Sequence, residues 1–125
     1  MWLKKREFAS YLLLWKVFKD QPFNIGEALD VLEDFMSRKV AYNVLKRLEK
    51  LGWISRVNSL EFKVLSFNEI FNSIVLPYLG LRLERNFRSK GYKIKVRVEN
   101  DRLKIEGETP PLKGLSKYYI IHYHQ

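Results

Sequence analysis

The sequence predicts an α+β protein, with helices and a short hairpin in residues 1–66 and a long helix plus a small antiparallel β-sheet in residues 67–125. Two patterns carry this prediction. Apolar residues recur every three or four positions over residues 37–51, which is typical of an amphipathic helix. Apolar and charged residues alternate over residues 92–99, which is typical of a half-buried strand. The 125 residues suffice for one domain, or for two very small ones that share a core.

The composition is that of a globular, basic protein. Hydrophobic residues make up 46% and charged residues 30% of the chain, which does not fit a disordered segment. The absence of cysteine excludes disulfides, thiolate metal sites and cysteine nucleophiles, and it is consistent with a reducing cytoplasm. The net charge of +9 is shared between both halves of the sequence. Such a charge favours polyanionic partners, nucleic acid first and anionic membrane second.

The N-terminal residues have some features of a targeting signal. Lys4, Lys5 and Arg6 precede an apolar stretch, as in a signal peptide. Lys16 and Lys19 interrupt this stretch, and no small-residue cleavage site follows. No uncharged run approaches the roughly 18 residues of a spanning helix. We therefore expect a soluble, cytoplasmic protein without a membrane partner.

Residues 4–19 form the first predicted helix. Its apolar face is wide, so we expect it to be buried on two sides, against later helices and against a second copy of the chain in a homodimer. We expect the charged side chains of this helix to be solvated. The apolar residues are Phe8, Tyr11, Leu12, Leu14, Trp15, Val17 and Phe18, and the charged ones are Lys5, Glu7, Lys16 and Lys19.

A second helix is predicted to begin after Asn24. Pro22 breaks the first helix, and Phe23 is suited to a short extended piece beside the hairpin. Asn24 and Glu27 have the spacing of a capping box, in which each side chain accepts a hydrogen bond from the other residue's backbone N–H.

The central helix is predicted between Ser37 and Gly52. Ser37 is a suitable N-cap, and Gly52 can adopt the left-handed conformation that ends a helix. Residues 53–64 contain two strand-like runs around a turn at Asn58-Ser59, which predicts a β-hairpin. The apolar stripe of the helix is Val40, Val44, Leu48 and Leu51, widened by Ala41 and Leu45. Its opposite face carries Lys39, Tyr42, Asn43, Lys46 and Lys50, with Arg38 at the edge.

The stretch SRKVAYNVLKRLEKLGWISR, residues 37–56, resembles the recognition helix and the start of the wing in winged helix-turn-helix DNA-binding proteins, such as MarR-like transcription regulators. Residues 25–32 match the preceding helix of that motif. The resemblance implies an N-terminal winged helix-turn-helix, double-stranded DNA as the partner, and a small dimeric transcription regulator. An ordinary amphipathic helix packed on a hairpin is the structural alternative.

The resemblance also implies which residues contact DNA. On the helix, arginine or lysine can bind guanine or phosphate, asparagine can pair with adenine, and tyrosine can touch a phosphate or a thymine methyl group. The hairpin would reach the adjacent backbone or the minor groove. The predicted DNA-binding residues are Arg38, Lys39, Tyr42, Asn43, Lys46, Arg56, Asn58, Ser59 and Lys63.

The second half of the chain is predicted to hold a long helix and a sheet. Ser66 and Glu69 form a capping box that opens the helix, and Pro77 either kinks or restarts it. Asn100-Asp101 is the expected turn between two strands, and residues 118–124 are a final strand. The sheet is basic, which either extends a nucleic-acid footprint or keeps an exposed face soluble. The basic residues of this half include Arg82, Arg85, Arg88, Lys90, Lys93, Lys95, Arg97, Arg102 and Lys104.

No catalytic site is predicted. His122 and His124 lie on one side of the last strand, but zinc requires further ligands that the chain does not offer. Asp30, Glu33 and Asp34 fit a solvated helix face, and the six glycines are isolated. We therefore expect no enzyme, metal or cofactor. Two other functions remain open, namely a protein-interaction module such as an antitoxin-like protein, and an accessory subunit that binds RNA or single strands.

Overall fold

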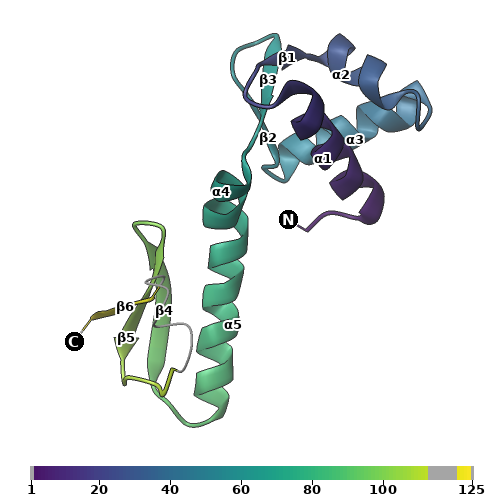
Figure 1. Ribbon diagram of the computed structural model, residues 1–125. Helices are drawn as coiled ribbons and strands as arrows, with labels where there is room; N and C mark the ends of the chain where they lie inside the picture. The colour runs from purple at the N-terminus through teal and green to yellow at the C-terminus, as the bar shows by residue number, and fades with distance from the viewer. Residues whose placement is uncertain (1, 113–120, 125) are drawn as a thin grey trace. The chain divides into compact units, whose positions relative to one another are not determined.

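The computed structural model describes residues 2–112 and 121–124 (Figure 1). The chain divides into two compact units, residues 1–70 and 71–125, and each is described by itself. Both units combine helices with a small sheet, which confirms the predicted α+β class. The assignment of the predicted parts, residues 1–66 and 67–125, to DNA binding and to dimerisation or accessory binding stays a prediction.

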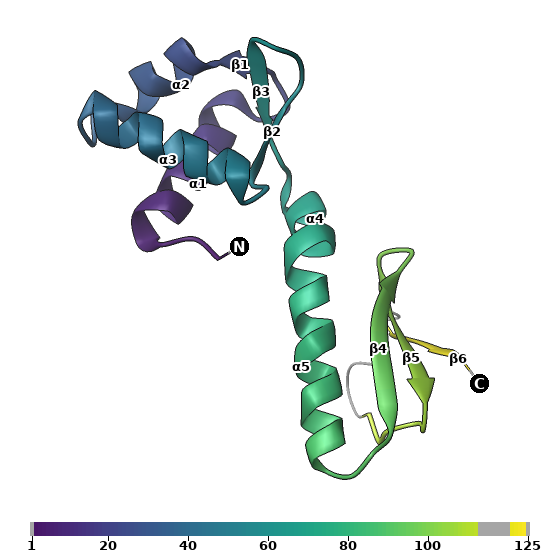
Figure 2. The same cartoon turned by 180° about the vertical axis from the view of Figure 1, so that it is seen from behind.

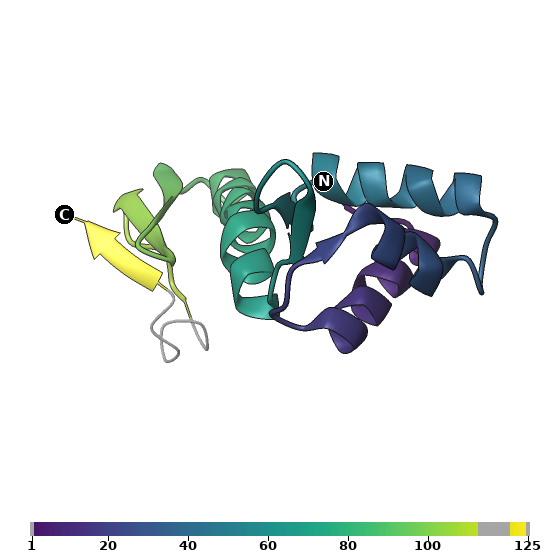
Figure 3. The same cartoon turned by 90° about the horizontal axis from the view of Figure 1, so that it is seen from above.

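The first unit packs helices against a three-stranded antiparallel sheet (Figures 2 and 3). The strand order is β1-β3-β2, and Phe23 of β1 lies opposite Phe62 of β3. This pairing confirms the predicted extended piece beside the hairpin. The elements are α1 (Lys5–Phe18), β1 (Phe23–Asn24), α2 (Ile25–Leu32), α3 (Arg38–Lys50), β2 (Ile54–Arg56), β3 (Glu61–Val64) and α4 (Phe67–Ile70).

Side-chain caps fix where these helices begin. The Asn24 side chain accepts a hydrogen bond from Glu27 N at 2.8 Å, and the Glu27 carboxylate accepts one from Asn24 N at 3.0 Å. The Ser37 hydroxyl accepts one from Val40 N at 3.2 Å. Gly52 follows α3 with φ of 87°. The predicted capping box, N-cap and helix end are therefore confirmed.

The core of the first unit is aromatic where α1 meets β2. Trp53 is buried, and its ring meets the Tyr11 ring edge-on at a centroid distance of 5.1 Å. The Tyr11 hydroxyl donates a hydrogen bond to the carbonyl oxygen of Leu65 at 2.7 Å. Burial, and secondly the negative charge of Glu69, raise the pKa of Tyr11 to about 12. Tyr11 is therefore a permanent hydrogen-bond donor in the core.

The buried face of α1 differs from the predicted one. It is centred on Tyr11 and Leu14, which have no exposed surface, whereas Phe8 is 41% and Val17 50% exposed. The prediction that Glu7 is solvated is wrong, because this side chain lies in the buried face. The reason is a cationic partner on α3, which the apolar periodicity of α1 cannot reveal.

The hairpin loop is longer than the predicted two-residue turn. It spans residues 57–60, and Val57 N donates to the carbonyl oxygen of Glu61 at 2.9 Å. Asn58 organises the loop, since its side-chain oxygen accepts from Leu60 N at 2.9 Å and from Glu61 N at 3.0 Å. The turn is thus held by an Asx-type side chain instead of by a glycine.

The long helical region begins with the predicted capping box, and its hydrogen-bond pattern changes just before the proline. Ser66 N donates to the Glu69 carboxylate at 2.8 Å, and α4 begins at the next residue. A π-helical segment (Phe71–Val75) precedes α5 (Leu76–Ser89), in which Pro77 lies in the first turn. Pro77 has no backbone N–H to donate, and the π-helical segment directly before α5 is where the helical hydrogen-bond pattern changes.

The second unit contains a sheet of β4 (Ile94–Glu99), β5 (Arg102–Gly107) and β6 (Ile121–His124) in the order β4-β5-β6. The predicted turn between β4 and β5 is confirmed, since Asn100 and Asp101 have φ of 53° and 60°, as in a type I′ hairpin. β6 pairs with β5 in parallel. The described sheet is therefore mixed and not wholly antiparallel.

Helix α5 packs on this sheet and also covers the edge of β4. Phe87 lies in a buried cluster with Ile94 and Ile105. The Glu84 carboxylate accepts a hydrogen bond from Val96 N at 2.8 Å, and Arg88 Nε donates to the carbonyl oxygen of Ile94 at 2.8 Å. These two side chains form hydrogen bonds with backbone groups of β4. β4 is an edge strand of the described sheet, and these backbone groups could otherwise pair with another chain.

Candidate nucleic-acid interface

Helix α3 has one buried and one exposed face. Ala41, Val44, Leu45 and Leu48 of the predicted apolar stripe are buried, whereas Val40 and Leu51 at its ends are half-buried. The opposite face is exposed, as predicted, and carries a hydroxyl, an amide and three ammonium groups. These residues are Lys39, Tyr42, Asn43, Lys46 and Lys50. The face is thus free to meet a partner outside the first unit.

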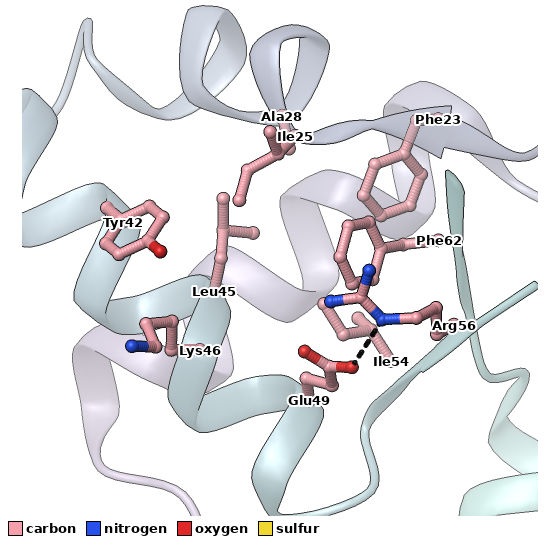
Figure 4. Close-up of a pocket in the computed structure, with 10 residues that line it drawn as sticks. All are labelled: Phe23, Ile25, Ala28, Tyr42, Leu45, Lys46, Glu49, Ile54, Arg56 and Phe62. Carbon is pink, nitrogen blue, oxygen red and sulfur yellow. Dashed lines mark hydrogen bonds and ion pairs between the residues drawn. The ribbon is translucent and has the colours of Figure 1, made fainter. Parts of the chain in front are cut away.

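Tyr42 and Lys46 lie together at the rim of a small pocket between α2, α3, β1 and the hairpin (Figure 4). The Lys46 ammonium is 5.3 Å from the centroid of the Tyr42 ring, within cation–π distance. The pocket has a volume of about 80 Å³. Since pockets for small ligands have volumes of roughly 300–1,000 Å³, this one does not suit a cofactor or effector.

Arg38 is engaged by the preceding helix. Its Nη1 atom is 2.8 Å from the Glu33 carboxylate and 3.5 Å from that of Asp30. The hydrogen bond to Glu33, together with the charges of both acids, raises the pKa of Arg38. Its charge is therefore already balanced within the first unit, and the structure gives Arg38 a role in joining α2 to α3.

Arg56 links the hairpin to α3. Its Nε is 3.2 Å from the Glu49 carboxylate, and its Nη1 donates to the carbonyl oxygen of Ser59 at 3.0 Å. The guanidinium lies 4.5 Å from the centroid of the Phe62 ring (Figure 4 shows Arg56 between Phe62 and Glu49). These contacts fix the hairpin loop against the helix, so Arg56 positions other residues of the predicted site.

The other predicted hairpin residues are less closely grouped. Asn58 is exposed, but its side chain is used within the loop. Ser59 is exposed at the loop tip, and Lys63 is half-buried on β3 opposite Ser55. The structure thus brings the helix residues together on one face. Of the hairpin residues, Asn58 holds the loop together, Ser59 is exposed and Lys63 is half-buried.

A groove that the sequence did not predict runs between the start of α1 and α3. It is lined by Lys4, Lys5, Arg6, Glu7, Val40, Asn43, Val44 and Arg47, and we call it the α1–α3 groove. Arg47 Nε lies 2.6 Å from the carboxylate of Glu7, which also accepts a hydrogen bond from Lys4 N at 2.8 Å. The feature of the sequence that could have indicated this groove is the spacing of four residues between Asn43 and Arg47, which puts both on one side of α3.

The basic residues of the second unit are partly used in local contacts. Arg97 pairs with Glu106, and Lys104 is 3.1 Å from the carboxylate of Glu99. Lys95 on β4 and Lys93 just before this strand are exposed. Of the basic side chains predicted on this strand, Arg97 is therefore paired within the second unit.

Among the residues whose side chains are described, no group of three or more His, Asp or Glu side chains could hold a metal ion. The side chains of His122 and His124 lie outside that part of the structure. Within residues 2–112 and 121–124, no helix has both the length and the apolar character needed to cross a membrane. Comparisons of the chain with protein-family models, with curated proteins and with solved structures found no match.

Proposed function

We propose that the first unit is a winged helix-turn-helix that binds double-stranded DNA, and that the protein is a small transcription regulator. The observation that carries this proposal is the exposed face of α3, which presents ammonium, hydroxyl and amide groups opposite a fully docked apolar stripe. The major groove of B-DNA admits one α-helix, and base edges there are recognised by such donors and acceptors.

The order of elements supports the same proposal. Helix, short strand, helix, turn, helix and hairpin follow one another in the first unit, and the short strand β1 joins the hairpin sheet. The resemblance of residues 37–56 to recognition helices and the net charge of +9 point the same way. The fit of sequence, element order and charge is the reason to prefer DNA over a protein partner.

Within this proposal, the predicted residues take different roles. Lys39, Asn43 and Lys46 would enter the groove, and Tyr42 would touch a phosphate or a thymine methyl group. Arg38 and Arg56 would hold α2 and the hairpin in place through Glu33 and Glu49. Ser59 and Lys63 would approach the neighbouring backbone.

A homodimer is part of the proposal. Exposed apolar side chains remain in both units, among them Val17 at 50% and Leu81 at 53% exposure. Helix-turn-helix dimers bind two half-sites that are spaced by about one helical turn of DNA. Sedimentation velocity of the full chain would measure its mass, and a monomer at all accessible concentrations would contradict the dimer.

The function is tested by binding duplex DNA at a series of salt concentrations. We expect the affinity to fall steeply, because each neutralised phosphate contributes a log–log slope of about −0.9 through counterion release. Random and genomic duplexes distinguish non-specific from specific binding. Salt-independent binding, or none at low salt, would contradict the proposal and favour a protein-interaction module.

A further inference from the structure

The α1–α3 groove is a strongly cationic feature of the first unit. Three consecutive basic side chains, Lys4, Lys5 and Arg6, line one wall, and Arg47 lines the other. Asn43, a member of the exposed face of α3, lies in the same groove. The groove is therefore continuous with the surface proposed to read DNA.

The acid of the groove does not cancel this charge. The Glu7 side chain is only 8% exposed, and it is already paired with Arg47 and with the backbone N–H of Lys4. The pair is neutral as a whole, so the charges of Lys4, Lys5 and Arg6 remain for a partner. A groove with this charge suits a chain of phosphodiesters, each of which carries one negative charge.

The segment of the first unit that precedes α3 has the opposite character. Residues 20–36, which include α2, contain Asp20, Glu27, Asp30, Glu33 and Asp34 and no lysine or arginine. Arg38, the first residue of α3, is bound by two of these acids. A phosphate backbone along α2 would meet repulsion from like charges, whereas one along the start of α1 would not.

We propose that the α1–α3 groove binds the sugar–phosphate backbone of duplex DNA, with Lys4 and Lys5 as the phosphate ligands. This inference rests on the proposed function and deepens it, because it assigns the side of α3 on which the DNA backbone runs. The helix that precedes α3 then acts as an acidic border that keeps the backbone away.

The test compares two double variants that remove the same charge from opposite ends of α1. K4Q/K5Q removes two groove ammonium groups, and K16Q/K19Q removes two exposed ones outside the groove. Full-length proteins are titrated with the same random-sequence duplex between low and moderate salt. We expect K4Q/K5Q to flatten the log–log slope by roughly 0.9 for each phosphate that the variant no longer neutralises, and K16Q/K19Q to leave the slope unchanged.

The outcomes separate the two proposals. If the wild type binds duplex DNA with a steep slope and both double variants change that slope equally, only overall charge matters and the groove assignment is overturned. If the wild type does not bind duplex DNA, the proposed function fails and the groove assignment fails with it. Melting curves of the variants verify that both remain folded, as expected for exposed side chains.

Discussion

Arg47 on α3 and Glu7 on α1 form an ion pair, with 2.6 Å between Arg47 Nε and Glu7 Oε2. The two side chains are unequally exposed, since Glu7 retains 8% and Arg47 44% of its accessible surface. The pair joins the first turn of α1 to the helix proposed to read DNA. It thereby couples the stability of the first unit to the geometry of the α1–α3 groove.

The unequal exposure predicts unequal costs of breaking this pair. Arg47→Met leaves a buried carboxylate without its partner, whereas Glu7→Met leaves a guanidinium that water can solvate. We expect Arg47→Met to lower the free energy of unfolding by about 1–3 kcal/mol more than Glu7→Met. Denaturant unfolding followed by tryptophan fluorescence measures this, because Trp2, Trp15 and Trp53 all lie in the first unit. Equal losses of unfolding free energy in the two variants would contradict the view that Glu7 is the buried member of the pair and Arg47 the solvated one.

The same pair predicts a dependence of stability on pH. Burial by itself would raise the pKa of Glu7, but the hydrogen bond from Lys4 N and the bond and charge of Arg47 outweigh burial and lower it. A carboxyl with a lowered pKa stabilises the fold above its unfolded pKa, about 4.3, and this contribution is lost as the pH falls through the folded value. The stability difference between wild type and Glu7→Gln should therefore shrink on acidification below that unfolded value. If the stability difference between wild type and Glu7→Gln instead grows in acid, the lowered pKa of Glu7 is contradicted.

The sequence predicted those features of the first unit that depend on neighbouring residues. The Asn24–Glu27 capping box, the Ser37 cap and the end of α3 at Gly52 involve groups within a few positions of one another. Their hydrogen bonds follow from local backbone geometry, so short motifs identify them. The exposed face of α3 was predicted for the same reason, because helical periodicity alone determines which side chains share a face.

Features that depend on distant residues were not predicted. Glu7 is buried because α3 brings Arg47 to it, and the two positions are far apart in the sequence. The ion pairs of Arg38 with Asp30 and Glu33 were likewise not predicted, because they depend on how the turn between α2 and α3 brings the two helices together. The parallel pairing of β6 with β5 likewise joins residues that are far apart in the sequence, such as Leu103 and Ile121.

Two glycines of the second unit form a matched pair for testing its packing. Gly91 and Gly107 have φ of 94° and 96°, so alanine at either position bears a similar conformational cost. A Cβ at Gly107 would overlap the carbonyl oxygen of Lys93, whereas one at Gly91 would meet nothing within 4 Å. Gly107→Ala should therefore cost about 1–3 kcal/mol more than Gly91→Ala. Hydrogen exchange of amides in β4 and β5 would measure the difference, and similar exchange in both variants would contradict the strand register.

The location of sequence specificity is tested by one residue from each unit. Asn43 is exposed on α3, and its amide can pair with adenine in a bidentate manner. Lys95 is exposed on β4, outside the helix proposed to enter the groove, so we expect it to add only a phosphate contact. Base contacts change the preference among sequences, whereas phosphate contacts change the affinity for all sequences alike.

Asn43→Ala should therefore reduce the ratio of specific to non-specific affinity by a factor that corresponds to about 1–3 kcal/mol. Lys95→Ala should lower both affinities together and leave the ratio intact, because binding to a phosphate does not depend on the base sequence. Competition between a selected site and random duplex, at one fixed salt concentration, measures the ratio for each variant. If Lys95→Ala changes the ratio while Asn43→Ala leaves it constant, the surface that reads DNA is the sheet of the second unit. Helix α3 would then be an ordinary amphipathic helix, and the DNA-reading role of its exposed face would have to be abandoned.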